Sequence, residues 1–224
     1  IDNVYFSSRL SNERKEIAGK VRKGDSVLVM FAGAAPYPIV IAKNSKAKVV
    51  YSNEINREAN KYAELNIGLN KVKGKVVLLP GDVKRVAKKI ASSSHPSRDL
   101  ARVINYQSYS LPQSRSPTPK ESFNVKNVSG FLVNYNSVPK KFDVIVMPRP
   151  QLKDSFLREA FLLSKKGTRI FYYDFCKEDE TDFIVEKIKN EAKKARKKIK
   201  ILRVKRAGEI APYKIRVRVD FNVV

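Results

Sequence analysis

Residues 26–42 have the sequence SVLVMFAGAAPYPIVIA, and this stretch decides the fold. Its first six residues form an almost wholly apolar run, which is typical of a central strand buried on both faces of a parallel sheet. A tight loop of small residues follows over 32–38, and a helix is predicted from Ile39. Ligands of open α/β sheets bind beyond the carboxyl ends of such strands. The loop lacks the GxGxxG dinucleotide fingerprint, and close packing of the helix on the strand stays open as an alternative to ligand binding.

The same alternation of strand and helix continues outward from this unit. Helices are predicted over residues 11–22, 57–69, 83–90, 152–163 and 181–200, and strands over 48–52, 75–79, 142–147, 167–173, 200–204 and 213–219. Alternating strands and helices imply a parallel α/β sheet with right-handed crossovers. Because no helix separates the last two strands, we expect them to form an antiparallel hairpin at one edge of the sheet.

Residues 92–140 interrupt this pattern, because they are rich in Ser, Pro, Asn and Tyr and show no sustained period. The segment is too long for an ordinary connection. We interpret it as an irregular insertion, with a short hairpin near residues 130–133, in a single domain that spans residues 1–224. Since the chain begins at Ile1 without Met, we expect it to be a fragment of something longer.

The charge of the chain points to a polyanionic partner. With 46 Lys and Arg against 22 Asp and Glu, the net charge is +24. Nucleic acid is the natural partner, because phosphates neutralise Lys and Arg without regard to sequence. An anionic membrane would need an amphipathic anchor or a lipidation signal, and generic basicity is the remaining alternative. Without a long apolar segment or a signal peptide, we expect a soluble, cytoplasmic protein and a monomer. Cys176 and His95 are the only residues of their kinds, which argues against a metal site.

Two carboxylates follow predicted strands at the edge where a ligand would bind. Glu54 comes about twenty residues after the loop, where an acidic residue can bind ribose hydroxyls. It could instead complement the dipole of the following helix. Asp82 could accept a hydrogen bond from an adenine amino group, or simply cap the helix that it precedes.

Three further segments could contact a substrate. Met147 to Pro150 (MPRP) follow the fourth strand, and Arg149 could touch a phosphate or a base, or be solvated. Arg9, Glu13 and Arg14 could form a base with an electrostatic stabiliser, or Glu13 and Arg14 could be a surface pair at a helix start. The lysine-rich face of the helix over 181–200 could contact an RNA backbone, or be an ordinary solvated face.

Together these segments resemble one family, the archaeal and eukaryotic-type tRNA (guanine-37 N1)-methyltransferases with the related wyosine-pathway enzymes. VYFSSRLSNER (4–14) is similar to that family's FSPRLxTER, and VLVMFAGAAPYPI (27–39) to its DxFAGVGPFxI. FDVIVMPRP (142–150) resembles DRIIMNLP, and RAGEIAPYKIRVRVDFNV (206–223) resembles the closing YAP...V-x-D-x-x-V. The resemblance implies the class I, Rossmann-like methyltransferase fold, with seven strands and an antiparallel C-terminal hairpin.

The resemblance also implies a cofactor, a partner and residue roles. The cofactor would be S-adenosylmethionine, and the partner tRNA, methylated on guanine N1 beside the anticodon. Glu13 would be the general base, and Arg9 and Arg14 match arginines of the family segment. The cofactor-binding residues would be Tyr5, Phe31, Ala32, Gly33, Ala34, Tyr37, Glu54, Ile55, Asp82, Val83 and Met147, and the substrate-binding residues Pro148, Arg149 and Pro150.

The sequence also departs from the family pattern. Val29 occupies a position where the family has Asp, Ala35 one where it has Gly, Pro148 one where it has Asn, and Ser8 one where it has Pro. We also expect the family's N-terminal tRNA-recognition domain to be missing. The sequence therefore predicts a guanine-37 N1 methyltransferase. Two alternatives stay open, a wyosine-pathway transferase that moves a methyl or an aminocarboxypropyl group, and a tRNA-binding relative that has lost catalysis.

Overall fold

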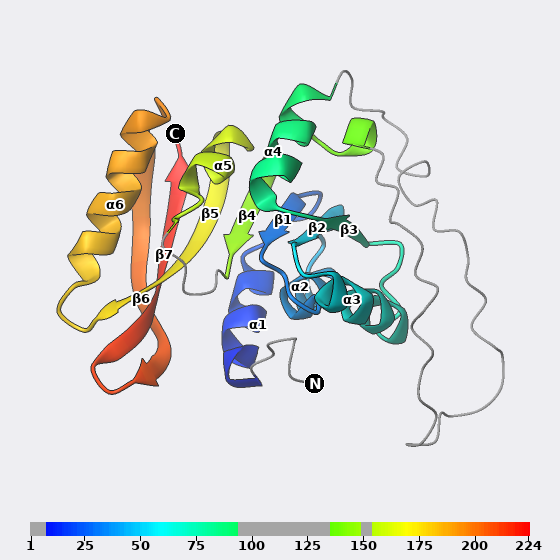
Figure 1. Cartoon of the computed structure of the whole chain (residues 1–224), viewed down its shortest axis with the longest axis horizontal. Helices are drawn as coiled ribbons and strands as arrows, with labels where there is room; N and C mark the ends of the chain where they lie inside the picture. Colours follow the sequence, from blue (N-terminus) through cyan, green and yellow to red (C-terminus); the bar gives the residue numbers. More distant parts are fainter. Residues whose placement is uncertain (1–7, 94–134, 149–153) are drawn as a thin grey trace, which may run out of the picture.

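The computed structural model describes residues 8–93, 135–148 and 154–224. They form one sheet with helices on both faces (Figure 1). The predicted hairpin near residues 130–133 lies outside the described residues, as do Tyr5, Arg149 and Pro150 among the predicted site residues.

The sheet has seven strands in the order β3-β2-β1-β4-β5-β7-β6. The first five strands of the chain are mutually parallel, and β7 pairs antiparallel with both β5 and β6. The predicted α/β fold with a closing antiparallel pair is thereby confirmed. The strands are β1 (Ser26–Met30), β2 (Val49–Glu54), β3 (Val76–Pro80), β4 (Phe142–Met147), β5 (Ser164–Lys177), β6 (Ile199–Ala211) and β7 (Lys214–Val223).

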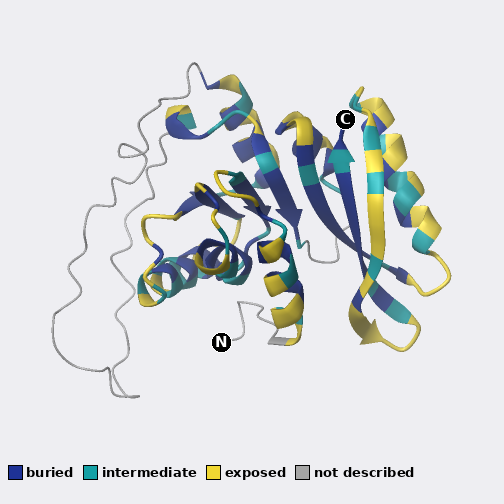
Figure 2. Ribbon diagram, turned by 180° about the vertical axis from the view of Figure 1, so that it is seen from behind, coloured by how far each residue is buried: buried dark blue, intermediate teal, exposed yellow. Residues whose placement is uncertain are grey.

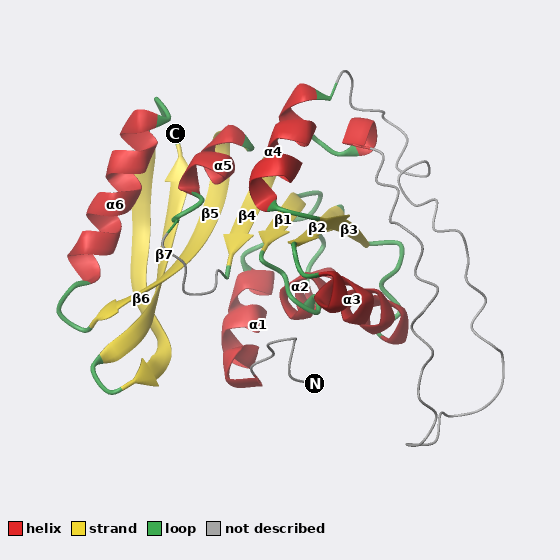
Figure 3. Ribbon diagram, in the orientation of Figure 1, coloured by secondary structure: helices red, strands yellow, loops and turns green. Residues whose placement is uncertain are grey.

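The helices alternate with the strands as predicted, but several differ in length (Figure 3). They are α1 (Ser11–Gly19), α2 (Pro36–Asn44), α3 (Arg57–Leu69), α4 (Val83–Ser92), α5 (Leu157–Leu162) and α6 (Thr181–Lys194), with short 3-10 turns η1 (Ser8–Leu10) and η4 (Tyr135–Ser137). The η1 turn leads directly into α1, so Leu10 stands at the cap position and no side chain there caps the helix. The predicted end of α6 is also too late, since Arg196 takes a left-handed φ of 53° and the chain enters β6 at Ile199.

Each face of the sheet carries its own core, because alternate residues of a strand point to opposite faces. Val27 and Val29 of β1 pack in one cluster with apolar residues of α1, α2 and α3. Leu28 and Met30 pack in the other, with α4, α5 and α6. Figure 2 shows the central strands buried, whereas the edge strand β6 is largely exposed. The fold therefore places α1 on the same face as the loop-bearing α2.

Candidate functional site

The loop between β1 and α2 is folded by left-handed residues. Phe31, Gly33 and Ala35 have φ values of 57°, 56° and 65°, and the Ala35 amide donates to the Ala32 carbonyl at 3.0 Å. Glycine takes this conformation readily, whereas a side chain pays about 1–2 kcal/mol for it. Ala35 is nevertheless fully buried as the residue before α2. The loop thus holds its small residues close to the end of β1, as the sequence predicted.

Glu54 ties this loop to the ends of the neighbouring strands. One carboxylate oxygen, Oε2, accepts from the Gly33 amide, and Oε1 accepts from the Asn56 amide, both at 2.8 Å. The amide group of Asn53 donates to the carbonyls of Leu79 and Gly81 at the end of β3. Because an ionised carboxylate offers about four acceptor positions, Glu54 keeps room for two more donors.

The other predicted residues of this edge differ in their surroundings. Ile55 is 64% exposed, a large apolar side chain left at the rim directly after Glu54. Asp82 caps α4, because its Oδ1 accepts a hydrogen bond from the Arg85 amide at 3.0 Å. The predicted capping role of Asp82 is therefore confirmed, and it uses one of the two carboxylate oxygens. Met147 is fully buried at the end of β4, and Pro148 after it is half-buried.

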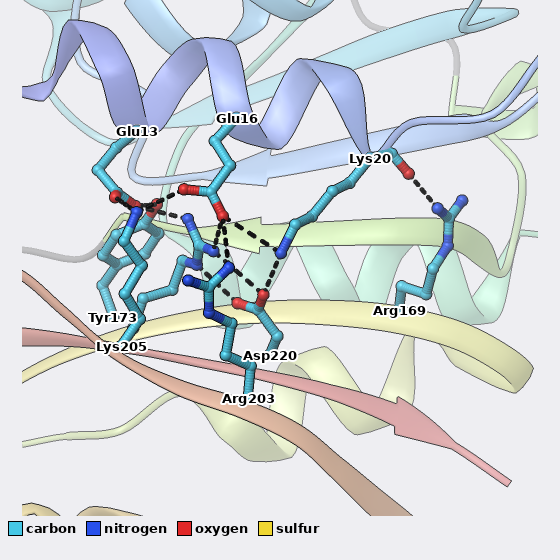
Figure 4. A network of polar contacts seen from close by, with 9 residues as sticks. Glu13, Glu16, Lys20, Arg169, Tyr173, Arg203, Lys205 and Asp220 are labelled. Atoms are coloured by element: carbon cyan, nitrogen blue, oxygen red, sulfur yellow. Dashed lines mark hydrogen bonds and ion pairs between the residues drawn. The ribbon is translucent and has the colours of Figure 1, made fainter.

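Glu13 lies buried on α1 and receives three hydrogen bonds from the sheet (Figure 4). The Tyr173 hydroxyl donates to Oε2 at 3.0 Å, Arg218 Nη1 donates to the same oxygen at 2.6 Å, and Lys205 Nζ donates to Oε1 at 2.6 Å. Tyr173 pairs with Arg218, and Arg218 with Lys205, in the strand register of β5, β7 and β6. The three donors therefore stand in one row across three adjacent strands, facing α1.

A second row of charges lies two residues away on the same face. Asp220 pairs with Arg203 in the register of β7 and β6, and it accepts from Lys20, the residue that follows α1. Glu16, one turn after Glu13, accepts from Arg218 and Lys205, both at 2.5 Å. The hydrogen bond from Arg218 holds the pKa of Glu16 well below its ordinary value, although burial opposes the shift. Together the two rows fasten α1 to the sheet by ion pairs.

Aromatic side chains connect Glu13 to the loop that follows β1. Tyr37, in the first turn of α2, stacks edge-on against Tyr173 with ring centroids 6.1 Å apart. The Arg14 guanidinium lies over the Tyr37 ring at 6.0 Å from its centroid. Burial raises the pKa of Tyr37 to about 12, so its phenol stays protonated at neutral pH. The structure thus brings Glu13, Arg14 and Tyr37 together.

Arg9 is not part of this group. It is exposed in η1, and no ion pair to it is found within the described residues.

Several residues of the site were not predicted from the sequence. The partners of Glu13 come from the end of the chain, about 160–205 residues away, and only the strand register brings them to α1. The closing segment does carry a signal, because Arg216, Arg218 and Asp220 alternate with apolar residues in it. Charged residues at strand positions that point into the protein indicate buried ion pairs, so this pattern could have predicted them.

The basic residues from the end of α6 onward separate into two groups. The helix runs back from the end of β5, so its C-terminal lysines lie at the edge where the parallel strands begin (Figure 1). Lys193, Lys198 and Lys200 are exposed there without an acidic partner among the described residues. Arg203 and Arg206 on β6 instead pair with Glu16 and with Glu178 and Glu209.

Within the described ranges, no cluster of three or more His, Cys, Asp or Glu residues could hold a metal ion. Among the same residues, no helix combines the length and the apolar character needed to cross a membrane.

Comparison with known proteins decides the family. A model of the TRM5/TYW2 methyltransferase domain matches residues 1–100. Over its whole length the chain is 33% identical to the tRNA (guanine(37)-N(1))/4-demethylwyosine(37)-methyltransferase Taw22 of Nanoarchaeum equitans, of which it covers 75%. The chain belongs to the TRM5/TYW2 methyltransferase family. The predicted family is therefore confirmed.

Other TRM5/TYW2 proteins agree with this membership. The tRNA (guanine(37)-N(1))-methyltransferase Trm5b of Pyrococcus abyssi is 28% identical over the full chain. Its crystal structure superposes with a TM-score of 0.70 over 99% of this chain and 51% of that one, at 27% identity. Methanocaldococcus jannaschii TYW2, solved in complex with AdoMet, has the same fold, with a TM-score of 0.68 at 21% identity. The chain thus spans about half the length of Trm5b and three quarters of Taw22.

Proposed function

We propose that this chain is an S-adenosylmethionine-dependent tRNA methyltransferase that modifies N1 of guanine 37. The observation that carries the proposal is the buried carboxylate of Glu13, linked through Tyr173 and Tyr37 to the small-residue loop after β1. A potential proton acceptor thereby stands beside a potential cofactor site. The named activities of Taw22 and Trm5b support the same reaction.

The residues at the carboxyl edge of the sheet fit the proposed cofactor. Glu54 keeps acceptor positions for the two ribose hydroxyls, and Ile55 offers an exposed apolar surface for a flat ring. The second carboxylate oxygen of Asp82 can accept from an adenine amino group, with Val83 beside it. Residues 31–37 and Met147 would line the methionine side, with Tyr5 of the family motif. S-adenosylmethionine, when bound, supplies an electrophilic methyl group.

Glu13 would accept the proton that leaves guanine N1. The N1–H bond breaks, an O–H bond forms on the carboxylate, and the electron pair stays on the guanine. Negative charge then grows on guanine O6, and a nearby guanidinium stabilises it. Arg14, buried against Tyr37, is better placed for this role than the exposed Arg9. Residues 148–150 would position the base after β4.

The second candidate is methylation of 4-demethylwyosine at the same position. The name of Taw22 includes this activity, and that protein is 33% identical over the whole chain. Pro148 replaces the family's Asn, and it cannot donate a hydrogen bond to the target base. Mass spectrometry of tRNA carrying either base at position 37 separates the two activities. Transfer of an aminocarboxypropyl group would show as a much heavier product.

We further propose that the chain forms one catalytic domain and acts as a monomer in the cytoplasm, with tRNA held by its basic surfaces. The single sheet formed by the described residues and the net charge of +24 support this. The lone Cys176 is buried and free, which fits a reducing compartment.

The proposal is tested by methyl transfer to unmodified tRNA with the chain and its Glu13→Gln variant. A general base contributes about 10²–10⁴-fold, so the variant should lose at least about a hundredfold in rate. Calorimetry should show that it still binds S-adenosylmethionine. Full activity of Glu13→Gln would contradict the assigned base. A folded wild type that binds tRNA but not the cofactor would instead be a relative that has lost catalysis.

A further inference from the structure

The two oxygens of the Glu13 carboxylate are held differently. Oε2 accepts two hydrogen bonds, from Tyr173 and Arg218, whereas Oε1 accepts one, from Lys205, among the described residues. The Oε2 donors come from inside the sheet, because Tyr173 is 1% exposed and Arg218 is completely buried. The Oε1 donor comes from the edge strand β6.

The Oε2 side is a rigid anchor. Arg218 also donates to Glu16 and to both oxygens of Asp220, so its guanidinium is fixed from three sides. It cannot leave Glu13 without breaking this whole set of charge-assisted bonds, which are the strong kind. Oε2 therefore has a structural role, because it holds α1 on the sheet through Arg218 and Tyr173.

Among the described residues, the Oε1 side is held by one partly exposed side chain. The Lys205 side chain keeps 28% of its surface exposed, and its ammonium also bonds Glu16 Oε2 at 2.5 Å. Hydrogen bonds to Glu13 and Glu16 raise the pKa of Lys205, so it is a cation at neutral pH. Because Glu16 also pairs with Arg218 and Arg203, it keeps two cationic partners when Lys205 is absent.

We propose that Lys205 is a displaceable cap on Oε1, the oxygen that takes the proton of the target base. This inference rests on the proposed function of Glu13 as the base. Lys205 compensates the buried carboxylate while no RNA is bound, because an unpaired buried charge is costly. When tRNA arrives, the ammonium leaves Oε1 for Glu16 or an RNA phosphate. Oε1 is then free to accept the N1 proton while Arg218 and Tyr173 hold Oε2 in place.

The charged groups around Glu13 allow the displacement of Lys205 to be followed through the pH dependence of the methylation rate. The groups that face it are Lys205 of β6, Arg218 of β7, Tyr173 of β5, Tyr37 of α2 and Glu16 of its own helix. Of the described cations that pair with Glu13, Lys205 is partly exposed and Arg218 is completely buried. Removing it leaves the ionised carboxylate with one cation fewer, which favours its protonation.

The test is Lys205→Met with Arg203→Met as its matched control. Arg203 lies two residues away on the same strand and face, and it pairs with Glu16 at 3.3 Å but not with Glu13. Both variants lose one positive charge, so both should lose the same small part of tRNA affinity. Single-turnover methylation is measured at saturating tRNA and cofactor between about pH 5 and pH 9. Melting curves establish that both variants are folded.

For Lys205→Met we expect a rate at the pH plateau about 3–10-fold above wild type, since no cap has to be displaced and the base is stronger. The acid limb of the profile should move to higher pH. Arg203→Met should keep the wild-type plateau and limb.

The proposed cap is wrong if the pH–rate profile of Lys205→Met matches that of Arg203→Met. It is also wrong if the plateau rate of Lys205→Met lies below that of wild type. Glu13→Gln, measured in the same assay, separates this failure from that of the proposed function. If Glu13→Gln is fully active, the base itself is wrong. If it is inactive while Lys205→Met behaves as the control, only the cap is wrong.

Discussion

At the scale of single residues, the site depends on side chains placed where the backbone or the core leaves little freedom. Ala35 is the clearest case, because it takes a left-handed φ of 65° and is fully buried at the start of α2. The sequence predicted a loop of small residues here, and it also showed that Ala35 stands where the family has Gly. It could not predict that Phe31 adopts a left-handed φ in the same turn.

A pair of substitutions at Ala35 tests this conformation. Ala35→Gly should change the free energy of unfolding by less than about 1 kcal/mol, because relief of left-handed strain offsets the loss of a buried methyl group. Ala35→Val should lose about 2 kcal/mol or more, since a β-branched side chain is strained there and has no space. Urea unfolding of the two variants measures the difference. Equal stabilities would show that the loop does not constrain this position.

At the scale of elements, the ion pairs between α1 and the β6–β7 hairpin are the part that local sequence patterns did not predict. The alternation of strands and helices predicted most elements and the closing antiparallel pair. It did not predict that β6 extends to Ala211, nor that its register places Lys205 beside Arg218. Register depends on pairing between distant segments, whereas periodicity reports only on neighbours along the chain.

The acid sensitivity of this element follows from Glu16, whose pKa is held below its ordinary value of 4.5. Because the pKa of Glu16 is lower in the folded protein than in the unfolded chain, its ion pairs stabilise the fold fully above about pH 4.5. This stabilisation is lost as the pH falls from that value toward the folded pKa. Glu16→Gln should therefore melt below wild type at pH 7, and the gap should narrow as pH drops under 4.5.

The control for this experiment is Glu58→Gln, which removes a more exposed pair with Lys61. Exposed pairs contribute about 0–1 kcal/mol, so its melting temperature should stay close to wild type across the same range. A gap for Glu16→Gln that persists unchanged at low pH would exclude the ion pairs as its cause.

At the scale of the whole molecule, the fold separates a group of exposed lysines from the proposed site. The proposed site lies at the carboxyl ends of the parallel strands, whereas Lys193, Lys198 and Lys200 lie around the end of α6, where these strands begin. Composition alone predicted a polyanionic partner. Only the fold shows that the lysine-rich end of α6 lies away from Glu13, so those lysines can assist binding without touching the reaction.

Replacing Lys193, Lys198 and Lys200 by Gln should lower tRNA affinity and leave the single-turnover rate at saturating tRNA unchanged. If each contacts one phosphate, the slope of log affinity against log salt should fall by about 2. The control replaces Lys71, Lys73 and Lys75, which are exposed beside β3 at the far edge of the sheet. Identical slopes for the two triple variants would remove the end of α6 from the RNA-binding surface.

The insertion of β7 between β5 and β6 also has a consequence for biosynthesis. Arg218 reaches Glu13 from a strand that is synthesised 205 residues later, so a nascent chain that still lacks β7 holds this carboxylate without that anchor. The first strands and helices can begin to collapse early, yet the proposed base is set in place only once β7 has been synthesised and has paired with β5.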